Sequence, residues 1–179
     1  MALGATIYNF TVQLSNTDRG VYEALALKVA RHPSEAEDYL LTRVLAYCLE
    51  YTEGIAFSRG LSDADEPAIA VRDLTGVLQS WIDIGTPDAA RLHKASKAAP
   101  RVAVYTHKGP VLLRQLAGER IHRTEALELY AFDRELLTGL VTRLDRRMAF
   151  DLQVTDRHLF LSTGGETLSG DIRRLALDA

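Results

Sequence analysis

One aspartate stands in an apolar stretch of the sequence, where a carboxylate is costly to bury. The stretch reads Trp81-Ile82-Asp83-Ile84-Gly85, and residues two apart in a strand share a face, so Asp83 lies on the same side as Trp81. A buried carboxylate needs a partner. Two alternatives stay open: Asp83 accepts hydrogen bonds from nearby backbone amides, or it acts as a metal ligand or base at the strand's carboxyl end, where α/β proteins often place sites.

A second pair of carboxylates precedes the neighbouring strand of the same predicted hairpin. Asp65 and Glu66 are adjacent in an acidic loop, and the hairpin connects them to Asp83. Hard divalent cations such as Mg²⁺ and Mn²⁺ bind carboxylate oxygens together with water. An isolated acidic loop is more often simply solvated, and the connection to Asp83 is what favours a metal site here.

Basic side chains follow the same segments. Arg91 and Lys94 are three residues apart on the helix predicted after Asp83, so they share a face that can lean back toward the strand end. Arg59 ends a predicted strand beside Gly60. These side chains could contact a phosphate, and the plainer alternative is an exposed basic face.

A third candidate segment lies at the start of the first predicted helix. Glu35 stands in the first turn, where an acidic residue complements the helix dipole. Ser34 is predicted to cap this helix in a capping box with Glu37. Ser34 and the nearby Arg31 could equally hold a phosphate or fix the helix start.

Composition limits the class of protein. The 179 residues fit one domain, 1–179, and the formal net charge of −3 argues against a basic coat protein of nucleic acid, although an enzyme with one positive groove remains open. The single cysteine, Cys48, forms no internal disulfide, and the sequence contains neither a signal peptide nor a long apolar span. We therefore expect a cytoplasmic protein without a membrane partner.

The elements that position these residues follow from periodicity and turn residues. Apolar residues alternate from Tyr8 to Leu14, which predicts a strand, and the segment 21–31 is predicted to pair back on it as a hairpin. The remaining predicted elements are a helix over 33–51, strands over 55–59, 68–72 and 77–85, a helix over 87–97 capped by Thr86, a strand over 101–106, a helix over 111–117, a strand over 125–131, a helix over 133–144, and strands over 148–154, 158–161 and 167–172. The order predicts an α/β (α+β) fold: a mixed sheet flanked by helices, with a second β-sheet from the N-terminal hairpin and the C-terminal strands.

With these residues in view, the chain resembles the YaeQ family. The resemblance rests on the stretches Met1-Ala2-Leu3, Ala5-Thr6-Ile7-Tyr8, Ala30-Arg31-His32-Pro33-Ser34-Glu35, Arg59-Gly60-Leu61, Asp65-Glu66-Pro67, Trp81-Ile82-Asp83-Ile84-Gly85, Pro87-Asp88 and Lys94-Ala95. These stretches occur in this order over the first 105 or so residues. The C-terminal part is similar in length and strand pattern.

The resemblance implies a variant of the PD-(D/E)xK nuclease-like fold and a set of site residues. In that superfamily a helix glutamate, an aspartate beside the second core strand and a (D/E)xK motif gather around Mg²⁺. The corresponding residues here are Glu35, then Asp65 or Glu66, then Asp83. The motif's lysine should fall two residues after Asp83, where this chain has Gly85, and Lys94 is the expected replacement.

Two hypotheses of different classes follow. In the first, the chain is a metal-dependent phosphodiesterase or nuclease acting on nucleic acid: the carboxylates hold Mg²⁺ or Mn²⁺, Lys94 assists the attacking water, and the arginines contact phosphate. In the second, it is a catalytically inactive binding or regulatory protein of the same fold, whose carboxylates pair with Arg31, Arg59 and Arg91. A small-molecule phosphate hydrolase would need the same residues.

Overall fold

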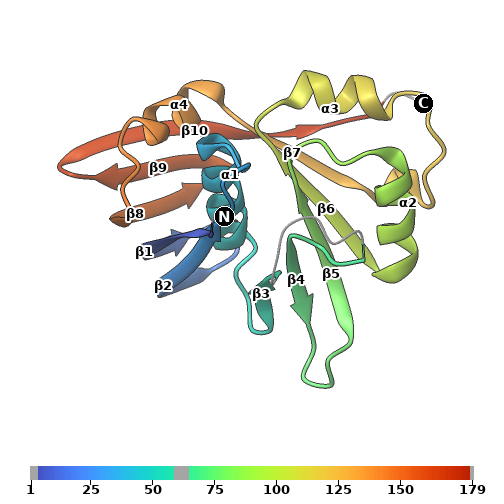
Figure 1. The fold of residues 1–179 in the computed structure, drawn as a ribbon, viewed down its shortest axis with the longest axis horizontal. Coiled ribbons are helices and arrows are strands. Elements are labelled where there is room, and N and C mark those ends of the chain that lie inside the picture. The colour runs from blue at the N-terminus through green and yellow to red at the C-terminus, as the bar shows by residue number, and fades with distance from the viewer. Residues whose placement is uncertain (1–3, 59–64, 178–179) are drawn as a thin grey trace. The chain divides into compact units, whose positions relative to one another are not determined.

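The computed structural model describes residues 4–58 and 65–177, and the chain divides into two compact units (Figure 1). Unit 1 comprises Met1–Leu41 and Phe132–Arg173, and unit 2 comprises Thr42–Ala131 and Arg174–Ala179. Each unit joins two separate stretches of chain. This interleaving explains why the sequence contains no linker between its parts.

Unit 1 contains the N-terminal hairpin and the closing strands. Its strands lie in the order β2-β1-β8-β9-β10, with β1 antiparallel to β2 and parallel to β8. The bounds are β1 (Thr6–Asn16), β2 (Val21–Arg31), β8 (Arg147–Thr155), β9 (His158–Thr163) and β10 (Glu166–Leu175), with helix α4 (Arg134–Val141) before β8. Because β1 pairs with β8, the predicted pairing of the hairpin with the C-terminal strands is confirmed. The prediction of a separate second sheet is wrong, because the strand order runs through all ten strands of one sheet.

Alternation sets which side of the unit 1 strands is buried. Tyr8, Phe10, Val12 and Leu14 are buried, and the residues between them face outward, as the sequence pattern predicts. On α4, Leu136, Leu137 and Leu140 are buried. Gly170 of β10 meets the side chains of Leu136 and Asp133, which places α4 against this strand.

Unit 2 contains the mixed sheet in which Asp83 lies. Its strands follow the order β3-β4-β5-β6-β7, antiparallel from β3 to β5 and parallel from β5 to β7. The bounds are β3 (Ile55–Phe57), β4 (Ile69–Arg72), β5 (Leu78–Ile84), β6 (Arg101–Thr106) and β7 (Glu128–Phe132), with helices α2 (Ala89–Ala98), α3 (Gly109–Leu116) and the short 3₁₀ helix η1 (Thr124–Ala126). Helix α1 (Glu37–Leu49) begins in unit 1 and belongs to unit 2 from Thr42 onward. The predicted order of helix, three meandering strands, helix and strand is confirmed, as is the mixed α/β class.

The two faces of the unit 2 sheet carry different side chains. One face supplies Trp81, Val102, Val104 and Leu129 to an apolar core. Helices α2 and α3 cover this face with a set of buried side chains, namely Leu92, Ala95, Leu112 and Leu116. Asp83 shares the face of Trp81 by alternation, and it therefore points toward α2.

The opposite face of the sheet meets the end of α1. Glu50, the residue after that helix, accepts hydrogen bonds from Arg101 and Tyr105, both on β6. The unit 2 part of α1 therefore covers the face away from α2. The sheet is flanked by helices on both faces, as predicted.

Three local predictions are wrong. Helix α1 begins at Glu37 rather than near Pro33, because Ser34 bonds the His32 ring through both its backbone N–H and its hydroxyl and does not cap the helix. Helix α2 begins at Ala89 and is capped by Asp88, not by Thr86. The segment 124–126 is a 3₁₀ turn, so the strand after it begins at Glu128.

Among the helices of residues 4–58 and 65–177, none combines the length and the apolar character that crossing a membrane requires.

Candidate functional site

The centre of unit 2 is an arginine–aspartate pair. Arg91 donates from Nε to Oδ2 of Asp83 at 2.7 Å and from Nη2 to Oδ1 at 3.0 Å, so both carboxylate oxygens accept from one guanidinium. The backbone N–H of Ala68 also points at Oδ1, at 3.4 Å. The Asp83 side chain is 3% exposed and that of Arg91 is 25% exposed. This planar, two-pronged arrangement is the strong form of a carboxylate–arginine bond.

The guanidinium of Arg91 has further partners. It lies over the Trp81 ring, with Cζ 5.4 Å from the ring centroid, and its Nη2 donates to the main-chain oxygen of Glu66 at 2.7 Å. Arg91 therefore joins β5, α2 and the segment before β4. A cation fixed by a ring, a carboxylate and a carbonyl is well positioned to stay in place.

The local sequence explains why Arg91 reaches Asp83. Gly85 has φ = +87° and turns the chain as β5 ends, and its N–H donates to the Tyr105 oxygen at 2.9 Å. The side chain of Asp88 then accepts from the Arg91 N–H at 2.8 Å and starts α2. Arg91 is thus in the first turn of α2, and long side chains of a helix point back toward its N-terminus.

Gly85 stands at the position where the resemblance to the (D/E)xK motif predicted a lysine. A φ of +87° belongs to the left-handed region, which glycine adopts readily and a residue with a Cβ adopts only with strain. The turn that places Arg91 beside Asp83 is therefore incompatible with an unstrained lysine at this position.

The expected replacement, Lys94, forms an ion pair with Asp65. Both side chains are largely exposed, 54% for Lys94 and 72% for Asp65. An exposed pair of this kind stabilises a protein by at most about 1 kcal/mol. The structure thus brings Asp65, Glu66, Asp83, Arg91 and Lys94 into one neighbourhood, as two ion pairs and one main-chain contact.

The remaining predicted site residues lie elsewhere in the chain. Glu35, Arg31 and Ser34 belong to unit 1, where Arg31 Nε donates to the main-chain oxygen of Glu35 at 2.9 Å. The Glu35 side chain is buried. Arg59 lies outside the described residues.

The Asp83 centre does not fit a divalent cation in this arrangement. A metal would have to share both Asp83 oxygens with Arg91, whose positive charge beside them repels a cation. Within the described part of the chain, no group of three or more histidine, cysteine, aspartate or glutamate side chains is placed to hold a metal ion.

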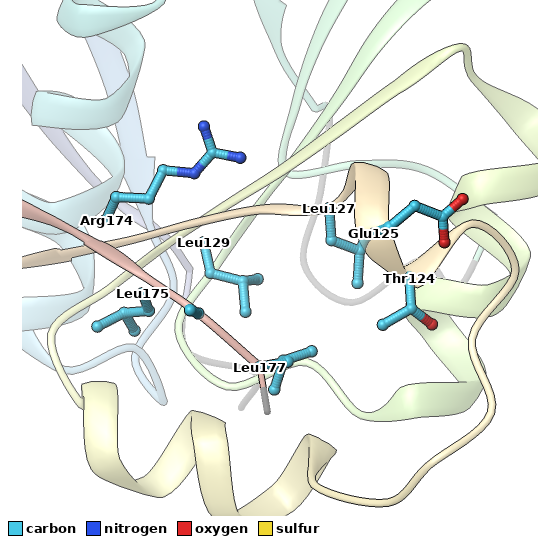
Figure 2. A pocket seen from close by; sticks show the side chains of 8 residues that line it. Thr124, Glu125, Leu127, Leu129, Arg174, Leu175 and Leu177 are labelled. Atoms are coloured by element: carbon cyan, nitrogen blue, oxygen red, sulfur yellow. The ribbon is translucent and has the colours of Figure 1, made fainter. Parts of the chain in front are cut away.

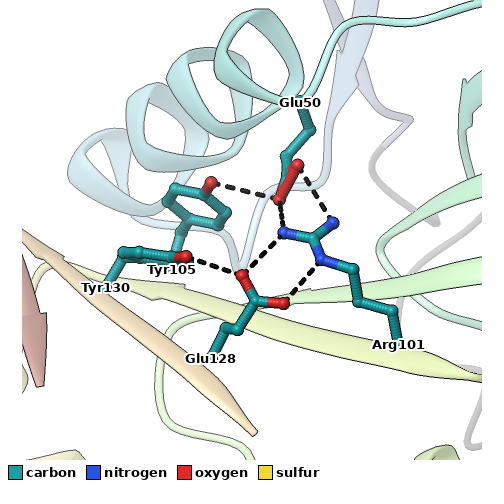
Figure 3. A network of polar contacts seen from close by, with 5 residues as sticks. All are labelled: Glu50, Arg101, Tyr105, Glu128 and Tyr130. Carbon is teal, nitrogen blue, oxygen red and sulfur yellow. Dashed lines mark hydrogen bonds and ion pairs between the residues drawn. The ribbon is translucent and has the colours of Figure 1, made fainter. Parts of the chain in front are cut away.

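A second polar cluster was not predicted from the sequence (Figure 3). Arg101 donates to Glu50 at 2.8 and 3.1 Å and to Glu128 at 2.7 and 3.1 Å. The Tyr105 hydroxyl donates to Glu50 at 3.1 Å, and the Tyr130 hydroxyl donates to Glu128 at 2.6 Å. One guanidinium therefore ties the end of α1 to β6 and β7.

The electrostatics of this cluster follow from its partial burial. Burial lowers the pKa of Arg101, but hydrogen bonds to Glu128 and Glu50 outweigh burial and raise it. Burial raises the pKa of Glu128, but hydrogen bonds from Arg101 and Tyr130 lower it below the ordinary value. Burial and the charge of Glu50 raise the pKa of Tyr105. At neutral pH Arg101 therefore stays a guanidinium, Glu128 a carboxylate and Tyr105 a neutral phenol.

Unit 2 also contains a pocket of about 470 Å³ beside η1 (Figure 2). Its wall is largely leucine, and Thr124, Glu125 and Arg174 add polar groups. Its lining residues are Thr124, Glu125, Leu127, Leu129, Arg174, Leu175, Ala176 and Leu177. The volume is within the range of small-molecule sites. Arg174 lies over the Tyr130 ring at 5.6 Å, on the side of the polar cluster.

The sequence is similar to those of known proteins over most of its length. Residues 1–172 match the family described as YaeQ protein. The chain is 32% identical to Uncharacterized protein YaeQ of Escherichia coli (strain K12) over 164 residues, covering 90% of this chain and 91% of that protein. It is also 32% identical to Uncharacterized protein YaeQ of Salmonella typhi over 170 residues, covering 94% of each.

Two crystal structures are similar to the whole chain. The YaeQ protein from Pseudomonas syringae superposes with a TM-score of 0.84 at 29% identity, covering 97% of each chain. The YaeQ protein from Xanthomonas axonopodis pv. citri superposes with a TM-score of 0.85 at 28% identity, covering 97% of this chain and 99% of that one. Sequence and fold agree over almost the full length, and the chain belongs to the YaeQ family.

Proposed function

We propose that this YaeQ family protein is a binding or regulatory protein that keeps a nuclease-like fold and lacks metal-dependent cleavage. In this proposal, the ion pair of Asp83 with Arg91 has a structural role and no catalytic one. One observation carries the proposal: the Arg91 guanidinium occupies both oxygens of the carboxylate that a metal would use.

The surroundings of the pair support the same conclusion. A guanidinium stays protonated at neutral pH and offers no lone pair. It can therefore neither bind a metal nor act as a base. Arg91 is also fixed by the Trp81 ring and by the Glu66 carbonyl, so its removal from Asp83 would cost several contacts at once. A metal would have to displace this cation before it reached the carboxylate.

The PD-(D/E)xK relationship remains part of the proposal. The order α1, β3, β4, β5, α2, β6, with antiparallel pairing up to β5 and parallel pairing beyond it, supports a nuclease-like core. Gly85 at the lysine position, with its positive φ, favours a core whose cleavage chemistry has been replaced. The metal-dependent nuclease predicted from the resemblance is the competing outcome of the experiment below.

The experiment is a cleavage assay on purified full-length protein. Labelled single- and double-stranded DNA and RNA are incubated with Mg²⁺ or Mn²⁺, and the products of wild type are compared with those of Asp83→Asn. We expect no divalent-dependent cleavage by wild type beyond the background of the variant. Cleavage by wild type that requires the divalent ion and disappears in Asp83→Asn would overturn the proposal.

A matched variant separates contamination from catalysis. Asp151→Asn changes an exposed carboxylate of β8 and leaves the Asp83 centre untouched. A nuclease carried through purification would leave wild type, Asp83→Asn and Asp151→Asn equally active. A genuine site would lower activity in Asp83→Asn alone.

A further inference from the structure

Positive charge is concentrated in one segment of an acidic protein. Residues 89–123 contain eight lysines and arginines and one carboxylate, Glu119, so their formal charge is +7. The whole chain has a formal charge of −3, which leaves −10 for all other residues. Three of the five histidines also fall in this segment. Such segregation within one chain creates a local positive field that the net charge conceals.

The fold presents the exposed cations of α2 and α3 on one side of unit 2, whereas Arg101 of β6 pairs with Glu50 and Glu128 on the opposite face. Helices α2 and α3 cover the same face of the sheet, and their inward residues form the apolar core. Lys97 in the last turn of α2 and Arg114 in the last turn of α3 are exposed. Gln115 of α3 donates to the Thr86 oxygen at 2.9 Å, which ties α3 to the turn before α2.

The loop after α3 is fastened to the end of α2. Arg123 Nη2 donates to the main-chain oxygens of Ser96 and Ala99 at 2.6 and 3.0 Å, and the Ser96 hydroxyl donates to the His122 oxygen at 2.6 Å. The exposed Arg120 therefore belongs to a segment held against α2. We call α2, α3 and residues 117–123 together the basic layer.

Of the six cations in the basic layer, Arg123 is bound by main-chain oxygens, and the other five divide into two groups. Arg91 and Lys94 are already paired with Asp83 and Asp65. Lys97, Arg114 and Arg120 form no ion pair with any described residue, and each is exposed. Their charges are therefore available to an external anion, since no internal carboxylate neutralises them.

We infer that the basic layer binds the phosphate backbone of a nucleic acid. This inference rests on the proposed function, because it names the ligand of a protein that binds without cleaving. Regularly spaced phosphates match several separate cations at once, and lysine and arginine are the usual contacts. A lipid surface fits less well, because Val111 is the one large apolar side chain that the described basic layer exposes, and a membrane-surface helix needs an apolar face.

The experiment measures binding in EDTA, so that no metal-dependent reaction contributes. Fluorescence anisotropy of labelled duplex DNA and of single-stranded RNA is followed at several salt concentrations, for wild type and for the triple variant Lys97→Gln, Arg114→Gln, Arg120→Gln. The slope of log K against log [salt] is about −0.9 per phosphate neutralised on a duplex and about −0.7 on a single strand. We expect the triple variant to bind about tenfold or more weakly and its slope to become shallower by about 2 to 3.

A charge-matched control tests whether location matters. Lys28→Gln, Arg134→Gln, Arg147→Gln removes three exposed cations of unit 1 and changes the net charge by the same amount. We expect this control to stay within about twofold of wild type, with at most a small change in slope. A comparison of the affinities for duplex DNA and single-stranded RNA shows which of the two the protein prefers.

Three results would overturn the inference: no salt-dependent binding by wild type, equal losses in the triple variant and the control, or binding to anionic vesicles with none to nucleic acid. Unfolding curves of both variants establish that they are folded. The failure of the proposed function is separately visible, because cleavage in Mg²⁺ would leave binding in EDTA intact.

Discussion

Arg91 donates two hydrogen bonds to Asp83 across eight residues of chain, from the first turn of α2 to the end of β5. In our proposal, this pair stands where the resemblance to the (D/E)xK pattern predicted a metal and a lysine. Asp83 is almost fully buried, and Arg91 supplies the positive charge that compensates its carboxylate. In our proposal, the stability of unit 2 and the lack of metal-dependent cleavage have the same structural cause.

The first prediction concerns the coupling between these two residues. Arg91→Ala leaves a buried carboxylate without its cation and is expected to lower the free energy of unfolding by about 3 to 5 kcal/mol. Asp83→Ala leaves a guanidinium that water can still reach, so its cost is smaller. Urea denaturation of both single variants and the double variant should give a double-variant loss well below the sum of the two. Additive losses would mean that the pair is not coupled.

The second prediction concerns the backbone at Gly85. Gly85→Lys restores the lysine of the motif in sequence, but φ = +87° should make it cost about 1 to 2 kcal/mol of stability and bring no cleavage activity. Gly76→Ala is the matched control, because Gly76 has the same φ of +87° and nothing within 4 Å of an added Cβ. Losses of similar size in both variants would assign the cost to the backbone conformation. An active Gly85→Lys nuclease would contradict this account.

The third prediction concerns Arg101. Replacing it with alanine leaves the buried Glu50 and the half-buried Glu128 close together without their shared cation. Because the guanidinium itself is about one-third exposed, we expect a loss near the low end for such clusters, roughly 2 to 3 kcal/mol. Arg134→Ala, an exposed arginine of α4, should change stability by less than about 0.5 kcal/mol. Equal effects of the two substitutions would show that the cluster contributes nothing.

The fourth prediction is a pH dependence from Glu128. Its pKa is lowered in the folded state, so this carboxylate contributes stability above its ordinary value of 4.5 and loses that contribution as the pH falls through the lowered value. The thermal stability of wild type should therefore fall more steeply than that of Glu128→Gln as the pH is lowered from about 5 to about 3. Glu125→Gln, at an exposed carboxylate of η1, should follow wild type. Parallel curves for wild type and Glu128→Gln would rule out the linkage.

Local patterns in the sequence predicted most of the fold. The alternation from Tyr8 to Leu14 and the apolar strand around Asp83 are short-range signals, and both were correct in type and face. The misplaced starts of α1 and α2 have a local cause as well. Ser34 and Thr86 both have the side chain of a capping residue, and the choice was decided by His32 in one case and by Asp88 in the other.

The site was harder to predict because its contacts join distant residues. Arg91 and Lys94 were predicted to share a helix face near Asp83, but the sequence left open whether an arginine or a metal would meet the carboxylate. Arg101 reaches Glu50 across 51 residues and Glu128 across 27 residues, and no periodic signal marks such contacts. The excess of lysine and arginine in the basic layer can be counted in the sequence. That α2 and α3 lie on the same face of the sheet is known only from the structure.

The central claim is that an arginine, and not a metal, holds Asp83. The most direct measurement is anomalous diffraction from crystals of the wild-type protein soaked in Mn²⁺, collected together with Arg91→Ala crystals as a control. We predict no manganese peak at Asp83 in wild type and an unchanged Arg91–Asp83 pair. A manganese peak about 2.1 Å from an Asp83 oxygen, with Arg91 displaced, would contradict the account.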